Sequence, residues 1–395
     1  ALRRVSEAEV RKAGGRVGCL VRTPGGCEFR YDTGYSGPPV ATSLPISALP
    51  TVAVAGAVPP FFAGLLPEGR RLVAVRSALK TSADDDFSLL LAIGHDTVGD
   101  VQVVPLGWEP PNPRRLESTR QVQFSGLMAQ VLGPDGFDRV GLPGVQDKVS
   151  SAMISLPVTM AAGPFILKLN PRGFPRLVEN EAFFLQAAKE SELPTVDFQV
   201  VYDAVQTPGL LVRRFDRVPA AGGWRPLAQE DGCQVLRRFP ADKYRVSSEE
   251  LLRALADQAT APVVCARDLL RQLAFAYLSC NGDAHAKNFS IRQASDGVWE
   301  ASPAYDLPSS HPYGDHSMAL PINGKVREDI GRTDFLAVGA FVGLPAKAVH
   351  RVLDQLCDAA ARWIGRLDEL PFDQRRIHKL RRAISFRRER LGKGE

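Results

Sequence analysis

The sequence predicts an α+β fold, and three observations along its 395 residues support this. Short runs of β-forming residues, separated by turns that contain Gly and Pro, occupy the first third of the chain. A strand, a helix and two further strands follow in the middle. After about residue 219 the apolar residues recur mostly at helical spacing. The length allows two or three domains with a sizeable core.

The first third is expected to form a small α/β unit. A helix that starts near residue 61 and runs towards Leu79 contains Pro67 and Gly69, so we expect a break there. The next helix has aspartates in its first turn and Gly94 at its end, both of which suit helix termini. The expected strands are residues 17–21, 27–31 and 101–106, the second helix begins at residues 82–86, and residues 108–115 form a linker.

The middle of the chain has the element order of a kinase small lobe. Residues 165–169 form a β-type run with Lys168 inside it, and the following helix carries Glu181 near its start. Two strands, residues 198–202 and 210–215, come next. In kinases such a lysine contacts nucleotide phosphates, and a helical glutamate holds the lysine in place. The alternative for the lysine is an edge strand with a solvated side chain.

The last part is expected to be mostly helical. Ser247 with the two glutamates that follow is a helix N-terminal signal. Residues 268–278 are apolar around much of the helix, so we expect a buried helix that leads directly into the polar loop at Asn281. A short strand at residues 298–300 and two closing helices, roughly residues 347–367 and 372–391, complete the chain.

Composition excludes some classes of protein. A hydrophobic content of 45% with 24% charged residues is typical of a soluble globular protein. The sequence contains no run of about eighteen apolar residues, so no transmembrane helix is expected. The first residues lack the features of a signal peptide, so none is expected. The six cysteines are scattered without a Cys-x-x-Cys pair, which favours reduced thiols and a cytoplasmic location. The net charge of +5 permits proximity to nucleic acid without requiring it.

Asp283, Asn288 and Asp306 form the constellation that carries chemistry. An Asp and an Asn five residues apart, with a second Asp downstream, is the pattern of kinase-type phosphoryl transfer. Asp283 would accept the proton of the attacking hydroxyl, and the other two residues would hold magnesium. The transferred phosphoryl group is rich in negative charge, so metal ions must neutralise it, and such ions prefer oxygen ligands.

Each of these residues also has a simpler interpretation. Asp283 and Asn288 can belong to a surface loop with an Asx-turn, and Asp306 can be a turn residue at the end of a strand. The order of Lys168, Glu181 and this acidic set favours the kinase interpretation over chance. His285 either orients the loop or touches a phosphate. His311 and His316 lack the partner ligands that a metal site requires.

The sequence contains neither a Walker-type motif nor a Gly-x-Gly-x-x-Gly loop. Residues 141–150 stand where a phosphate-covering loop belongs, and two glycines and a lysine there can offer backbone N–H groups and positive charge to an anion. An ordinary turn is the alternative. Near the C-terminus, residues 375–390 are strongly basic with apolar residues at helical spacing. They predict a solvated helix face or a contact with phosphates or an acidic partner.

Taken together, these residues resemble the HipA family of serine/threonine protein kinases, which are toxins of bacterial type II toxin–antitoxin pairs. The run from Gly282 to Ser290 is the most specific match. The further matching blocks, in order, are residues 61–69, 86–99, 144–148, 166–168, 180–181, 214–217, 229–234 and 305–306.

The resemblance implies a bilobal protein-kinase-like fold with an α/β N-terminal subdomain and an all-α C-terminal subdomain. The expected parts are an N-terminal α/β subdomain at residues 1–113, a small-lobe-like region with the phosphate loop and the ATP lysine at residues 114–218, and a helical kinase subdomain with the catalytic loop at residues 219–395.

The resemblance also implies residue roles. Asp283, Asn288, Asp306 and Lys168 would be catalytic, and Asn288 and Asp306 would bind Mg²⁺. The residues expected to contact ATP are Pro143, Gly144, Val145, Gln146, Asp147, Lys148, Lys168, Arg213, Arg214, Phe215, His285, Lys287, Asn288, Tyr305 and Asp306.

Partners follow from the resemblance as well. It implies a HipB-like helix-turn-helix antitoxin, operator DNA reached through that antitoxin, and no membrane. The family's known substrates include aminoacyl-tRNA synthetases. Phosphorylating such an enzyme would stop tRNA charging and cause growth arrest and persistence.

Two departures from the family pattern matter. Gly141 stands where family members often carry a serine whose autophosphorylation inactivates the kinase, so that reaction is impossible there, and Ser150 or Ser151 are the nearby substitutes. Arg213 stands where an acidic hinge residue is frequent. Two other functions compete with the protein kinase: a corepressor that works with its antitoxin on DNA, and a small-molecule kinase on the same fold.

Overall fold

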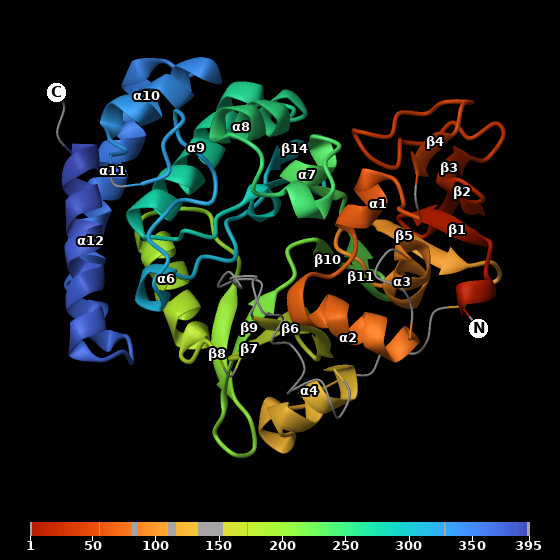
Figure 1. Ribbon diagram of the computed structural model, residues 1–395, viewed down its shortest axis with the longest axis horizontal. Helices are drawn as coiled ribbons and strands as arrows, with labels where there is room; N and C mark the ends of the chain where they lie inside the picture. The colour runs from red at the N-terminus through yellow and green to blue at the C-terminus, as the bar shows by residue number, and fades with distance from the viewer. Residues whose placement is uncertain are drawn as a thin grey trace.

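The computed structural model describes residues 2–54, 56–80, 85–109, 116–132, 153–171, 173–327 and 329–392. In Figure 1 an N-terminal β-sheet unit lies on the right, a second sheet lies at the lower centre, and the C-terminal helices fill the left and the top. Most of the expected linker and the whole expected phosphate loop, residues 141–150, lie outside the described residues.

The N-terminal unit is built on a five-stranded antiparallel sheet with the order β4-β3-β2-β1-β5. Phe29 of this sheet packs with Phe62 and Phe87 of the adjoining helices in one core. The elements are β1 (Glu7–Lys12), β2 (Gly15–Thr23), β3 (Gly26–Tyr31), β4 (Thr51–Val54), α1 (Pro60–Gly64), α2 (Gly69–Leu79), α3 (Asp86–Ile93) and β5 (Val101–Pro105).

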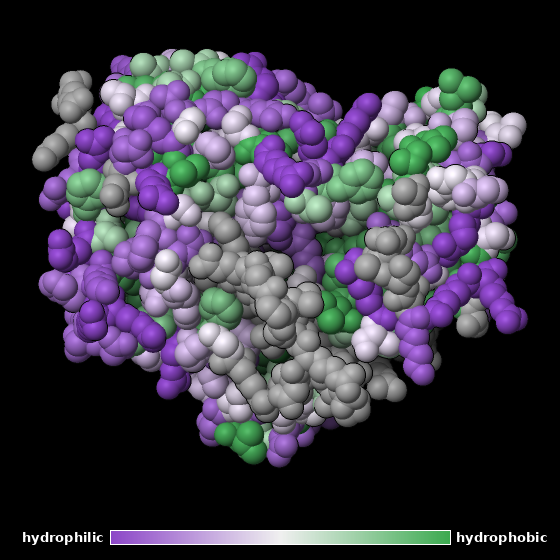
Figure 2. All heavy atoms as spheres, in the orientation of Figure 1, coloured by the Kyte–Doolittle hydropathy of each residue, from purple (hydrophilic) through white to green (hydrophobic). Residues whose placement is uncertain are grey.

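The helix break expected near Pro67 is confirmed, because α1 ends at Gly64 and α2 begins at Gly69. Asp85 caps α3 by accepting a hydrogen bond from the backbone N–H of Ser88, and Gly94 is its C-cap. The strands β1 and β4 were not predicted. Val52 and Val54 of edge strand β4 are exposed. Figure 2 shows hydrophobic residues on the surface at the upper right, the side on which Figure 1 draws β4.

A second, four-stranded antiparallel sheet has the order β6-β7-β9-β8. Alternate residues of β7, Phe165 and Leu167 among them, pack with Phe124 of α4 in one core cluster, while α6 covers the other face. The elements are α4 (Phe124–Leu132), β6 (Ile154–Met160), β7 (Gly163–Leu169), α6 (Leu177–Glu190), β8 (Phe198–Tyr202) and β9 (Pro208–Arg213).

Strand β7 is a central strand, with β6 on one side and β9 on the other. Lys168 on this strand is only 9% exposed, so the alternative of an edge strand with a solvated lysine is wrong. Strand β6, which was not predicted, is the edge strand that pairs with β7 on its outer side. This arrangement points Lys168 away from the Phe165–Leu167 face.

The C-terminal part is mainly helical, and its core is continuous with α6. Buried Trp363 of α11 packs against Phe184 and Phe275 from α6 and α9. The helices are α7 (Gly232–Val235), α8 (Ser248–Asp257), α9 (Pro262–Leu278), α10 (Arg332–Phe341), α11 (Ala346–Ile364) and α12 (Gln374–Gly392), with α12 at the left edge of Figure 1.

The expected all-α character of this subdomain needs correction. A hairpin, β10 (Arg217–Ala220) and β11 (Gly223–Pro226), precedes a three-stranded sheet of β12 (Gln229–Asp231), β13 (Ser290–Gln293) and β14 (Trp299–Ala301). The short strand expected at residues 298–300 is confirmed as β14. The other four are three or four residues long, so their alternation was too short to distinguish from loop. They matter because β12 and β13 flank the polar loop that follows α9.

The fold class is therefore α+β, as predicted. All six cysteines are free, and all but Cys19 are buried. Among the described residues, no helix has both the length and the apolar character needed to cross a bilayer.

Candidate active site

A cavity of about 310 Å³ lies where the three parts of the fold meet. Two loops of the N-terminal unit form one wall of the cavity, and the β6–β7 hairpin forms another. The polar segments after α9 and β14 form its floor. The lining residues used below are Leu65, Leu66, Glu68, Asp96, Thr97, Val98, Lys168, Arg214, Asp231, His285, Lys287, Asn288, Tyr305 and Asp306.

Lys168 is the charged centre of this cavity. Its ammonium Nζ lies 2.6 Å from Glu181 Oε1 and 3.0 Å from Asp306 Oδ1. Burial by itself would lower the pKa of Lys168, but the carboxylates of Asp306 and Glu181 outweigh it and raise that pKa above its usual value. The lysine is therefore charged at every physiological pH.

Two carboxylates share this one ammonium group, and their pKa values move apart. Lys168, together with a hydrogen bond from Asn288, outweighs burial and lowers the pKa of Asp306. Burial raises the pKa of Glu181 to about 7, because the nearby Asp306 carboxylate adds to a desolvation cost that Lys168 only partly offsets. Asp306 is thus the more strongly ionised partner in the folded protein.

Asn288 meets Asp306 directly. The amide Nδ2 of Asn288 donates to Asp306 Oδ2 at 2.8 Å, and its Oδ1 accepts from the backbone N–H of His285 at 3.0 Å. Asp306 has the left-handed φ of 57°, a conformation that Asp adopts more readily than most residues. Its carbonyl accepts from the side chain of Asn281 at 3.2 Å, which ties it to the polar loop after α9.

Helix α9 positions this loop. The helix is buried over most of its surface and ends at Leu278, so the chain enters Asn281 from a rigid element. Asn281 Oδ1 then accepts from the backbone N–H of Asp283 at 3.1 Å. Asp283 Oδ1 accepts from the phenol of Tyr244 at 2.8 Å. Asp283 is 2% exposed and lies in the loop beside the cavity, while His285 and Asn288 of the same loop line it.

His285 is a neutral side chain in this loop. Burial, together with the positive charges of Lys243 and Lys287, lowers its pKa well below the usual value. Within the described residues its Nδ1 is buried without a hydrogen-bond partner, although the side chain lines the cavity. Such a nitrogen is available to a ligand that enters the cavity.

Lys287 of the loop is held by neighbours rather than left free. Its ammonium donates to Asp231 Oδ2 at 2.9 Å and to the carbonyl of Gly64 at 3.0 Å. Glu68 lies 3.9 Å from it and binds Lys243 at 2.6 Å. Gly64 and Glu68 belong to the N-terminal unit, so that unit contacts the polar loop after α9 itself.

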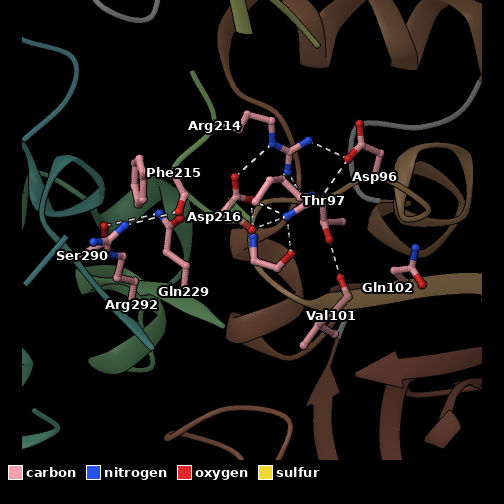
Figure 3. Close-up of polar contacts among 12 residues, drawn as sticks. Asp96, Thr97, Val101, Gln102, Arg214, Phe215, Asp216, Gln229, Ser290 and Arg292 are labelled. Carbon is pink, nitrogen blue, oxygen red and sulfur yellow. Dashed lines mark hydrogen bonds and ion pairs between the residues drawn. The ribbon is translucent and has the colours of Figure 1, made fainter. Parts of the chain in front are cut away.

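A second contact joins the N-terminal unit to the end of β9. Figure 3 shows Arg214 and Asp216 facing Asp96 and Thr97 from the loop before β5. Arg214 Nη1 lies 2.6 Å from Asp96 Oδ1, and its Nη2 donates to the Thr97 carbonyl at 2.6 Å and to Asp216 Oδ2 at 2.8 Å. We call Asp96, Arg214, Asp216 and Arg217 the hinge cluster.

The hinge cluster places Asp96, Thr97 and Val98 in the cavity wall. Asp216 Oδ2 also accepts from the backbone N–H of Gly99 at 2.9 Å and from Arg217 at 2.7 Å. Burial raises the pKa of Asp216, but the two arginines and the Gly99 N–H outweigh it and leave that pKa below its ordinary value. The Asp216 carboxylate is therefore fully ionised, and it joins the segment after β9 to the N-terminal unit.

Most of the predicted site residues come together. Lys168, Arg214, His285, Lys287, Asn288, Tyr305 and Asp306 all line the cavity, and Glu181 and Asp283 contact or adjoin this set. Arg213 does not line it, because its guanidinium lies over the Phe165 ring and donates to the Ala162 carbonyl. Phe215 does not line it either, although its ring lies 5.6 Å from that of Tyr305. Residues 143–148 lie outside the described residues.

Several site residues were missed. Glu68, Asp96 and Asp231 lie in blocks that resemble the family but were given no role, and Tyr244 lies in a segment for which no element was expected. Asp231 had a local signal, since it starts a helix with a capping box closed by Gln234. The others act through contacts across more than a hundred residues or between distant loops, which no local pattern reveals.

The residues fit a magnesium-nucleotide. The Asp306 carboxylate and the Asn288 amide are in contact and carry oxygen atoms of the kind that Mg²⁺ prefers, beside a buried lysine that can meet a phosphate. Asn288 would present its amide oxygen to the ion, since the nitrogen cannot act as a ligand.

Comparisons with known proteins agree with this geometry. A family model described as the HipA-like C-terminal domain matches residues 140–364, and one described as the HipA N-terminal domain matches residues 8–104. The chain is 32% identical over 358 residues to a Sinorhizobium fredii protein named "Putative kinase Y4mE", covering 83% of this chain and 84% of that protein.

Two further similarities come from Shewanella oneidensis. The "Serine/threonine-protein kinase toxin HipA" is 28% identical over 316 residues, which covers 74% of this chain and 71% of that protein. A chain in the solved complex of HipA, HipB and operator DNA matches with a TM-score of 0.80 at 22% identity, covering 97% of each chain. That likeness shows the same fold.

Proposed function

Because the chain belongs to the HipA family and is a HipA-like kinase, we propose that it transfers the γ-phosphate of ATP to a serine or threonine of a protein. One observation carries the proposal. Lys168 on a central strand is bound at once by Glu181 on a helix and by Asp306 after a strand, and Asn288 meets the same carboxylate. This is the arrangement that aligns phosphates in protein kinases.

Each residue has a proposed part in the reaction. Lys168 binds the phosphates, and Glu181 fixes the lysine's position. Asn288 and Asp306 hold Mg²⁺, which when bound neutralises charge on the phosphates. Asp283 accepts the proton of the attacking hydroxyl, and its fixed place between Asn281 and Tyr244 orients the carboxylate for that task. Arg214 and Tyr305 line the cavity as well, and they border the end of the nucleotide that is away from the transferred phosphate.

We propose further that the protein is the toxin of a type II toxin–antitoxin system. The Shewanella relative is named as a toxin kinase, and the solved structure of that system contains HipB and operator DNA. A HipB-like helix-turn-helix antitoxin is the proposed partner, and operator DNA is reached through it. The proposed substrate is a protein, with an aminoacyl-tRNA synthetase as the leading candidate, and its phosphorylation causes growth arrest and persistence.

The experiment combines purified protein, Mg²⁺, γ-labelled ATP and a bacterial extract. A labelled protein band is expected, and Asp283→Ala should abolish it while the variant still binds nucleotide. Label that appears only in small molecules indicates a small-molecule kinase. Absence of transfer from a folded protein that still represses its operator with an antitoxin indicates the corepressor. Either result would overturn the proposal that this chain is a protein kinase.

A further inference from the structure

The segment before α8 holds the catalytic loop at two points. Tyr244 donates its phenol O–H to Asp283 Oδ1 at 2.8 Å. The carbonyl of the preceding residue, Lys243, accepts from the backbone N–H of Ala286 at 3.1 Å. The Tyr244 ring also packs edge-on against His285, with centroids 5.2 Å apart. A side-chain contact and a backbone contact therefore fix the loop on both sides of Ala284.

The same segment is attached to the N-terminal unit. The Lys243 ammonium lies 2.6 Å from Glu68 Oε2, and the side chains are only 10% and 29% exposed. Glu68 lies in the connection between α1 and α2 and also approaches Lys287 of the loop at 3.9 Å. An ion pair shielded in this way is screened less by salt than a surface pair. The path from Glu68 to Asp283 therefore consists of one ion pair, one peptide bond and one hydrogen bond.

A general base works only when its carboxylate faces the hydroxyl it deprotonates, and small misplacements are costly. A carboxylate can turn about its Cβ–Cγ bond, so a fixed donor at one oxygen defines the direction of the other. Tyr244 is a dependable donor, since burial and the Asp283 charge raise the pKa of its phenol above the usual value. It therefore keeps its proton throughout the physiological range.

We propose that Tyr244 is a positioning residue for the base Asp283, and that the Lys243–Glu68 ion pair makes this position depend on the N-terminal unit. The inference rests on the proposed function, because it needs Asp283 to act as a base. It gives the N-terminal unit a part in catalysis besides its share of the cavity wall. The competing explanation is that Tyr244 and Glu68 serve only to pack the fold.

Steady-state kinetics of Tyr244→Phe separate the two explanations. The ring is retained, so the contact with His285 persists and only the hydrogen bond is lost. We expect kcat to fall about ten-fold, as for a modest misplacement of a reacting group, while KM for ATP stays within a factor of two because the phosphate-binding residues are untouched. A packing role would instead lower thermal stability or nucleotide binding without this separation of kcat from KM.

Tyr313→Phe is the matched control. Its phenol donates to the Pro175 carbonyl at 3.1 Å in an exposed contact, so its kcat should equal that of the parent protein. Glu68→Gln is the second variant, which breaks the ion pair without touching the segment itself. It should lower kcat in the same direction, and the double variant Glu68→Gln with Tyr244→Phe should lose less than the product of the two single effects.

The outcomes are distinguishable. If the parent protein transfers no phosphate, the proposed function fails and the assignment of Tyr244 fails with it. If the parent transfers phosphate and Tyr244→Phe matches its kcat, only the assignment of Tyr244 is overturned. If the single effects of Glu68→Gln and Tyr244→Phe multiply independently, the link to the N-terminal unit is overturned.

Discussion

Lys168 and Asp306 are 138 residues apart in the chain, and the ammonium of one lies 3.0 Å from the carboxylate of the other. Glu181, on α6, completes the group from the opposite side at 2.6 Å. A strand, a helix and the segment after β14 thus meet at one buried cation. These two contacts connect the central strand β7 to α6 and to the segment after β14.

Lys168→Met should remove both activity and stability. The variant leaves Glu181 and Asp306 buried without their counter-charge, which costs about 3–5 kcal/mol of unfolding free energy. Loss of a phosphate-binding charge should lower phosphate transfer by about a hundred-fold or more. Urea unfolding and the labelled-ATP assay measure the two effects. Lys189→Met is the control, because Lys189 pairs with Asp197 on the surface at 3.6 Å. Equal losses in the two variants would contradict the role of Lys168.

Asp306→Asn should uncouple nucleotide binding from magnesium. Asn tolerates the left-handed backbone conformation at this position, so the fold should persist while the metal-binding charge is lost. We expect Mg²⁺ to raise the melting temperature of the parent protein in the presence of ATP, and to leave that of Asp306→Asn nearly unchanged. Asp268→Asn, at an exposed pair with Arg267, should behave as the parent does. A full magnesium response in Asp306→Asn would show that another residue holds the ion.

Asp216→Asn should loosen the N-terminal unit at the hinge cluster. Asp216 accepts from Arg214, Arg217 and the Gly99 N–H, so the substitution leaves two buried arginines short of a counter-charge. We expect a loss of about 3 kcal/mol and faster hydrogen exchange in the loop that carries Asp96. Glu300→Gln, at the more exposed pair with Arg292, supplies the comparison. Unchanged exchange in that loop would mean that the hinge cluster does not hold it.

His311 should make the protein less stable in acid. Burial and the nearby His316 lower the pKa of His311 from 6.5 to about 4. Between these two pKa values the unfolded chain binds a proton there and the folded protein does not. The free energy of unfolding should therefore fall as pH drops from 6.5 towards 4. His311→Gln should flatten this part of the pH profile of the melting temperature, whereas substitution of exposed His378 should not. A profile unchanged by His311→Gln would exclude this residue as the cause.

Sequence reasoning predicted which charged side chains meet in the cavity better than it predicted their surroundings. Lys168, Asn288 and Asp306 were predictable because phosphoryl transfer restricts their type, order and spacing. Tyr244 and Glu68 were not, because a hydrogen bond or an ion pair between distant loops leaves no periodic signal. Arg213 shows the reverse error. The family resemblance implied that Arg213 contacts ATP, but its side chain lies over the Phe165 ring, outside the cavity lining.

Secondary structure was likewise predictable where the local sequence determines it and was missed elsewhere. The long helices α9, α11 and α12 were predicted from apolar spacing, with ends within a few residues except at the start of α9. The strands from β10 to β13 were not, because they are three or four residues long, and β12 pairs with β13 from a distant part of the chain. Strand β6 was missed even though it is longer. It contains Pro157, a residue that argues against a strand assignment except at an edge, where β6 lies.

The mixed origin of the cavity wall matters for inhibitor chemistry. Leu65, Leu66 and Val98 give it an apolar side supplied by the N-terminal unit, and phosphoryl transfer places no demand on these side chains. A compound that reaches from the nucleotide position onto this apolar side would gain affinity from surface that the reaction does not constrain. Selectivity for this enzyme over kinases without such a unit should therefore be obtained there rather than at the charged side chains around Lys168.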